Sequence, residues 1–154
     1  MPHHRAMIFI LLLGLCVASN NGLAQSEPRQ LVLVCSAELP ATSLTHTEVR
    51  QLFLGMPIEK NGVDFTPLRN SSDPLITEVF LQKIIFMSKR NYERQLATRV
   101  FRLGGARPAV YSNVSELRDA LRQSPGAVSY MWAKDVLQDD DLKSIGVLWQ
   151  GSVD

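Results

Sequence analysis

The sequence predicts an α/β domain with a mostly parallel sheet flanked by helices. Three observations lead to this fold class: apolar stretches of strand length, segments of helical spacing between them, and capping motifs where the helices should begin. Strands that alternate with helices give a layered fold with a largely parallel sheet. The chain of 154 residues contains no internal repeat and no low-complexity stretch.

The N-terminal segment is typical of an export signal. Arg5 precedes an apolar run from Ala6 to Val17, and small residues follow it. The run is too short to span a bilayer, so a cleaved signal is favoured over a membrane anchor. Cleavage fits best after Ala24, with Ala18 as a second candidate. We expect a signal peptide over 1–24, a linker over 25–30 and one domain over 31–154, which would be periplasmic or secreted and without a stable membrane span.

Charge and cysteine content exclude several classes of protein. The chain has 16 basic and 15 acidic residues, and losing Arg5 with the signal leaves 15 of each. This neutral balance gives no reason to expect nucleic acid or an anionic membrane as partner. Cys35 is the only cysteine after the signal, so no internal disulfide is expected. It lies in an apolar run, which favours burial as a small hydrophobic residue over a reactive thiol.

The first elements follow from local pattern. The stretch "LVLVCS", residues 31–36, is a continuous apolar run typical of a strand covered on both faces. Thr45-His46-Thr47-Glu48 is a capping box that begins a short helix, and Gly55 ends that helix. Asn61-Gly62 predicts a turn. "FTPLRN", residues 65–70, predicts a second strand, with Pro67 marking an edge or a strand end.

The next segments are helical. Residues from Ile76 to Met87 follow helical spacing, with Lys83 on the apolar side and extra apolar residues that predict a largely buried helix. Ser88 is expected to cap another helix, in which Tyr92, Leu96 and Val100 repeat every four residues.

The remaining segments complete the alternation. Residues 102–108, "RLGGARP", predict a glycine-rich loop, and Asn113 begins a helix through a motif similar to a capping box. Residues 127–131 and 142–149 predict two further strands. Between them, the acidic run 139–141 is read as a solvated turn.

The residue inventory argues against most catalytic sites, metal sites and cofactors. His46 is the only histidine after the signal, and a structural zinc site needs about four histidine or cysteine ligands. The glycine-rich loop is too short for a dinucleotide fingerprint. A serine hydrolase would have to combine His46 with Ser71 or Ser72, and His46 is better read as a solvent-facing residue. We therefore expect no catalytic residue, no metal and no cofactor.

One stretch offers a binding site. In "PLRNSSDPLITEVF", residues 67–80, an arginine and several hydroxyl groups lie at a predicted helix start, where free N–H groups attract anions. The alternative is an ordinary cap by Ser72 or Asp73, with Pro74 in the first turn. Asp73 would itself satisfy the helix dipole and repel a phosphate or sulfate. From these residues alone, the capping interpretation is favoured.

The order of segments resembles the phosphate-type periplasmic solute-binding proteins of ABC transporters, in the type-II periplasmic binding protein superfamily. The resemblance is carried by "LVLVCS", "SLTHTEVRQLFLG", "FTPLRNSSDPLITEVFLQKII", "RLGGARP" and "LRQSPGAVSYM", and covers nearly all of residues 31–136. It implies a fold similar to one lobe of such a protein and non-enzymatic binding. The family's Ser-Gly-Thr turn falls on Pro74-Leu75-Ile76, which has no hydroxyl, and the family's arginine falls on Asn70, next to Arg69. The family's N-terminal half is absent, so the chain looks closest to the short, stand-alone relatives.

The resemblance implies a small oxyanion such as phosphate as ligand, with an ABC permease or another envelope protein as partner. The alternative is a protein-interaction or signalling module of the envelope that kept the scaffold and lost the ligand. The residues expected at a binding site are Arg69, Asn70, Ser71, Ser72, Leu75, Ile76, Gly105 and Arg107.

Overall fold

The computed structural model describes residues 28–152 and builds them around a five-stranded sheet in the order β5-β4-β6-β1-β7. β4 pairs in parallel with β5 and β6, and β1 pairs antiparallel with β6 and β7. Four strands therefore run in one direction and β1 runs against them, which confirms the mostly parallel α/β fold. The strands are β1 (Arg29–Ser36), β4 (Thr66–Asn70), β5 (Ala109–Tyr111), β6 (Ala127–Trp132) and β7 (Leu142–Gly151).

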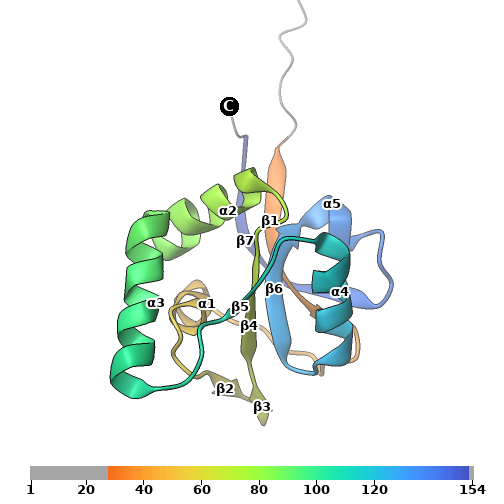
Figure 1. Cartoon of the computed structure of the whole chain (residues 1–154). Coiled ribbons are helices and arrows are strands. Elements are labelled where there is room, and N and C mark those ends of the chain that lie inside the picture. The colour runs from red at the N-terminus through yellow and green to blue at the C-terminus, as the bar shows by residue number, and fades with distance from the viewer. Residues whose placement is uncertain (1–27, 153–154) are drawn as a thin grey trace, which may run out of the picture.

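Helices cover both faces of this sheet (Figure 1). One face carries α1 (His46–Phe53), α2 (Pro74–Phe80), the π-helix η1 (Leu81–Ile85) and α3 (Lys89–Leu103); the other carries α4 (Val114–Gln123) and the short α5 (Ala133–Val136). Strand β1 is apolar from Leu31 to Cys35 because both of its faces are covered. Leu31, Leu33 and Cys35 pack into the core beneath α1 to α3, whereas Val32 and Val34 pack beneath α4 and α5.

An aromatic cluster connects the larger core to the end of β4. The rings of Phe80 and Tyr130 stack with centroids 3.7 Å apart, and Phe53 packs edge-on against both. The Tyr130 hydroxyl donates to the backbone oxygen of Asn70 at 3.0 Å. Burial raises the pKa of Tyr130, so the hydroxyl stays protonated and remains a donor. The cluster therefore fixes Asn70, the last residue of β4, next to Arg69.

The predicted helix caps are confirmed. Thr45 and Glu48 form the reciprocal bonds of a capping box at α1. Ser88 Oγ accepts from the backbone N–H of Asn91 at α3, and Asn113 Oδ1 accepts from two backbone N–H groups at α4. These side chains satisfy donors that the first turn leaves free.

Some boundaries differ from the prediction. β1 begins at Arg29, two residues inside the expected linker, because it pairs there with Gly151. The turn at Asn61-Gly62 is confirmed, and it joins two short strands that were not predicted, β2 (Glu59–Lys60) and β3 (Val63–Asp64). β5 and α5 were also missed, since each is too short to show a period.

The helix predicted through Met87 is interrupted. α2 ends at Phe80, and the chain continues as the π-helix η1 up to Phe86, which has a φ of 58°. A π-turn contains more residues than an α-turn and shifts the side chains that follow. Lys83, expected on the apolar side, is consequently exposed. Leu81, Ile84 and Ile85 remain buried.

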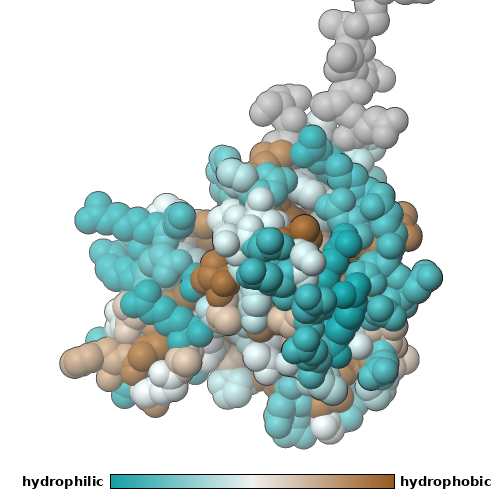
Figure 2. Space-filling view, turned by 45° about the vertical axis from the view of Figure 1, so that its right-hand side comes forward, coloured by the Kyte–Doolittle hydropathy of each residue, from teal (hydrophilic) through white to brown (hydrophobic). Residues whose placement is uncertain are grey.

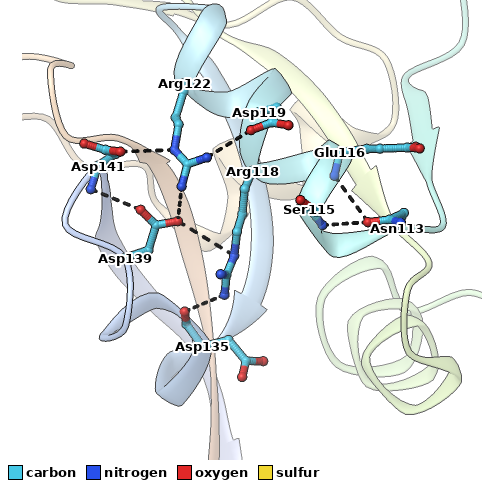
Figure 3. A network of polar contacts seen from close by, with 9 residues as sticks. All are labelled: Asn113, Ser115, Glu116, Arg118, Asp119, Arg122, Asp135, Asp139 and Asp141. Atoms are coloured by element: carbon cyan, nitrogen blue, oxygen red, sulfur yellow. Dashed lines mark hydrogen bonds and ion pairs between the residues drawn. The ribbon is translucent and has the colours of Figure 1, made fainter.

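The interpretation of residues 139–141 as a solvated turn is wrong for Asp139. Its side chain is 4% exposed and accepts from Arg122 Nη2 at 2.7 Å, while Arg118 Nε lies 3.8 Å away (Figure 3). The other carboxylate oxygen accepts from the backbone N–H of Asp141. Arg118 and Arg122 are one turn apart on α4 and reach the same carboxylate. The network fastens the loop before β7 to α4.

Within residues 28–152, no helix combines the length and hydrophobicity needed to cross a membrane. The proposed signal peptide lies outside the described residues.

Candidate functional site

The candidate site begins with Arg69, near the carboxyl end of β4. Its side chain is 10% exposed. Nε donates to the backbone oxygen of Pro108 at 3.1 Å, Nη1 donates to Glu93 Oε1 at 2.6 Å, and the guanidinium lies 5.7 Å from the Tyr92 ring centroid. The arginine therefore connects β4, the loop before β5 and the first half of α3.

Arg107 reaches the same carboxylate from the opposite side. Its Nη1 lies 3.4 Å from Glu93 Oε2. Arg69 and Arg107, both expected at an anion-binding site, thus contact the same carboxylate of the protein itself. Glu93 has 38% of its side chain exposed, so solvent and solutes reach this pair of arginines from one side.

The start of α2 is also occupied. Asp73 Oδ1 accepts from the backbone N–H of Leu75 at 2.9 Å, and Oδ2 accepts from Trp132 Nε1 at 3.0 Å. Pro74 has no N–H to offer. The backbone N–H groups of Ser71 and Ser72 donate to Tyr111 O and Asn70 Oδ1. The helix start is therefore capped by the carboxylate of Asp73.

A cavity of about 590 Å³ lies between the end of β4, α2 and the start of α3. Arg69, Asn70 and Ser71 line it, together with Glu93 and Tyr130. In the described residues, no hydrogen-bond partner is found for Arg69 Nη2. Both signs of charge and an aromatic ring thus face one cavity.

The other residues expected at the site lie elsewhere. Ser72 and Ile76 line a smaller hollow of about 280 Å³ beside Trp132. Gly105 and Arg107 line a third, beneath the loop that follows α3. Leu75 packs against the larger core. The structure therefore divides seven of the eight predicted residues among three hollows and places Leu75 against the core, and their role in binding remains a prediction.

Sequence reasoning missed Glu93 and Tyr92. Glu93 is the only acidic residue in the strongly basic segment 83–107, and that isolation could have marked it as an internal partner for the arginines. The Tyr92 hydroxyl donates to Phe53 O at 2.6 Å, and burial is the main cause that raises the pKa of Tyr92. Tyr92 therefore lines the cavity as an uncharged side chain that is held in place by its hydrogen bond.

The hydrolase arrangement does not form. His46 Nε2 contacts the backbone oxygen of Leu148 at 2.9 Å, while Ser71 and Ser72 donate to Tyr111 O and Asn70 Oδ1. No hydrogen bond inside the described range joins His46 to either serine. Cys35 is buried as expected, and burial raises its pKa to about 11, so its thiol is protonated. Residues 28–152 contain no group of three or more His, Cys, Asp or Glu side chains arranged to hold a metal ion.

The cavity lies at the carboxyl end of a parallel strand, which is where α/β folds commonly bind ligands. Comparison with solved structures confirms this fold. The chain is similar to an ABC-type phosphate transport receptor from Vibrio cholerae, with a TM-score of 0.55 and 15% identity over 77% of this chain and 46% of that one. It is also similar to a putative phosphate ABC transporter substrate-binding protein with bound phosphate from Clostridium perfringens, with a TM-score of 0.54 and 12% identity over 77% of this chain and 44% of that one.

PstS from Borrelia burgdorferi is a third match, with a TM-score of 0.52 and 13% identity over 77% of this chain and 47% of that one. This chain thus spans less than half the length of the proteins that it matches, which fits a single-lobe relative. No family model and no curated protein sequence matches it. At these identities the likeness establishes the fold.

Proposed function

We propose that this chain is an exported, non-catalytic recognition module of the cell envelope, built on one lobe of the phosphate-type binding fold. One observation carries the proposal: Arg69 and Arg107, both expected at an anion-binding site, bind Glu93, a carboxylate of the protein itself. The arginines are held by the protein and do not require a ligand to balance their charge.

A free anion would face two obstacles at this position. It would have to displace Glu93 from Arg69, whose buried guanidinium makes a charge-assisted bond with it. At the start of α2 it would have to compete with the Asp73 carboxylate, which already accepts from the backbone N–H of Leu75. Both obstacles favour the interaction module over a phosphate carrier.

Calorimetry tests the proposal. Wild-type protein titrated with phosphate or sulfate is expected to give no binding heat, because Glu93 already binds the arginines. The titration extends to about 1 mM, which covers any affinity useful for uptake. Glu93→Gln removes the internal anion while keeping a similar shape, and it should gain weak phosphate binding. Glu116→Gln is the matched control, since Glu116 is exposed on α4 and lies outside the site. Micromolar phosphate binding by the wild type would overturn the proposal.

Small-oxyanion binding is the second candidate, because Arg69 faces a cavity of about 590 Å³ with Nη2 free of protein hydrogen bonds among the described residues. In that case phosphate or a similar anion would enter beside Glu93, and an ABC permease would be the expected partner. The wild-type titration separates the two candidates, since only this one gives heat without the Glu93→Gln substitution.

A further inference from the structure

The neutral composition of the chain conceals a strong separation of charge. Residues 83–107 contain one acidic residue, Glu93, and seven basic ones. The basic residues are Lys83, Lys89, Arg90, Arg94, Arg99, Arg102 and Arg107. Residues 109–141 contain six acidic and three basic residues. Such a distribution creates a local positive potential that attracts acidic partners even when the total charge is near zero.

A groove of about 730 Å³ runs through the basic region, between the end of α1 and the outer side of α3. Leu54, Met56 and Met87 line it and pack on the larger core. Arg94, Arg99 and Arg102 form its basic side, and Arg99 is held in place because its Nε donates to Gly55 O at 2.6 Å. The groove therefore combines an apolar base with a row of guanidinium groups.

Apolar side chains are exposed where α3 ends. Phe101 is 91% exposed and Leu103 is 70% exposed, and Leu103 also lines the groove. Figure 2 shows hydrophobic surface at the lower left of the molecule, at the height where α3 ends in Figure 1, below strongly hydrophilic side chains. Exposed aromatic and aliphatic groups beside arginines are typical of interaction surfaces.

We propose that this groove docks an acidic, amphipathic segment of a partner protein, a proposal that rests on the recognition role stated above. An amphipathic helix would place its apolar face on Met56, Met87 and Leu103 and its carboxylates on the arginines. A bilayer surface fits a concave groove poorly. A second copy of this chain is disfavoured because its acidic cluster is engaged internally, with Asp119, Asp139 and Asp141 all bound to Arg122 (Figure 3).

A designed peptide tests the docking surface. The probe is a fluorescent helical peptide with leucine at positions i, i+3, i+4 and i+7 and glutamate elsewhere, titrated with the full chain at low salt. Its counterpart, with lysine in place of glutamate, is not expected to bind. Raising the salt from about 0.05 M to 0.5 M should lower the affinity for the acidic peptide by roughly tenfold or more, because the charged contacts are exposed to solvent and are screened.

Two matched pairs of variants locate the binding. Arg102→Glu should lower the affinity for the acidic peptide by roughly fivefold to tenfold, whereas Lys134→Glu, with the same change of charge on α5, should leave it unchanged. Leu103→Ser should weaken it by about fivefold, whereas Leu137→Ser, at another exposed leucine, should not.

Each contrary result overturns the proposal. These results are absence of peptide binding at about 1 mM, equal binding of the lysine peptide, or equal losses in both members of a pair. Binding to phosphatidylglycerol vesicles without peptide binding would assign the surface to a membrane. Self-association in light scattering that Arg102→Glu abolishes would assign it to a second copy. Phosphate titration of the same samples reports separately on the recognition role, so failure of one proposal is distinguishable from failure of the other.

Discussion

Removing the Asp139 carboxylate should destabilise the domain strongly, although the residue lies in an acidic run that looks solvated in the sequence. The carboxylate is 4% exposed and accepts two hydrogen bonds, from Arg122 and from the backbone N–H of Asp141. Arg118 Nε is buried, with no hydrogen-bond partner and with Asp139 as its nearby counter-charge at 3.8 Å. Asp139→Ala would therefore leave several donors uncompensated.

The magnitude follows from these contacts. A hydrogen bond to a charged group contributes roughly 1.5–3 kcal/mol and one to a backbone N–H about 1 kcal/mol. Solvent access on one side of the network reduces the first contribution. We expect Asp139→Ala to lower the free energy of unfolding by about 3 kcal/mol, which lowers the melting temperature by roughly 10 °C for a domain of this size.

Urea unfolding followed by circular dichroism measures the change. Asp139→Asn keeps an acceptor for the backbone of Asp141 and should lose about half as much. Asp140→Ala removes an exposed carboxylate from the same run and should change stability by less than about 0.5 kcal/mol. A loss below about 1 kcal/mol for Asp139→Ala, equal to that of Asp140→Ala, would refute the structural role of the network.

Two further perturbations test the packing. Gly126→Ala should lower the free energy of unfolding by about 3 kcal/mol, because φ is +86° and the new Cβ would lie 2.5 Å from Asp64 O. Gly62→Ala is the control: its φ is +76° but its surroundings are open, so it should lose only about 1 kcal/mol. Equal losses in urea titrations of the two variants would contradict the close contact at Gly126. Burial raises the pKa of Cys35 from 9.0 to about 11, so its contribution to stability is complete below pH 9 and falls as the pH rises toward 11, where the unfolded chain forms thiolate first. Cys35→Ala should remove about 2 kcal/mol of the pH-dependent loss, and an unchanged pH profile would contradict the burial of the thiol.

The fold could be predicted because its main signals are local. The apolar run of β1 and the capping residues Thr45, Ser88 and Asn113 each act within a few residues. The interruption at η1 could not be predicted, since the apolar residues Leu81, Ile84 and Ile85 suit a continuous buried helix equally well. β5 was missed because three residues are too few for an alternating pattern; its position depends on pairing with β4.

The candidate site was predicted in part, for a similar reason. Arg69 and the cap at Asp73 follow from the strand-to-helix pattern. Glu93 could not be assigned in the same way, because it lies 24 residues from Arg69 and 14 from Arg107 and is brought to them only by the tertiary fold. The separation of basic and acidic residues could not be read from the neutral net charge, since composition does not record on which side of the molecule the charges lie.

The pairing of Arg69 and Arg107 with Glu93 has a physical explanation. A side-chain carboxylate is a tethered anion, and its effective concentration beside the guanidinium groups exceeds that of a dilute solute. Once Glu93 supplies that anion, Arg69 gains a different role: it holds Pro108 through Nε and α3 through Nη1. Replacing Arg69 would therefore leave Glu93 with only the weaker contact from Arg107 and release the loop before β5. The ion pair therefore fastens β4 to α3 and to the loop before β5.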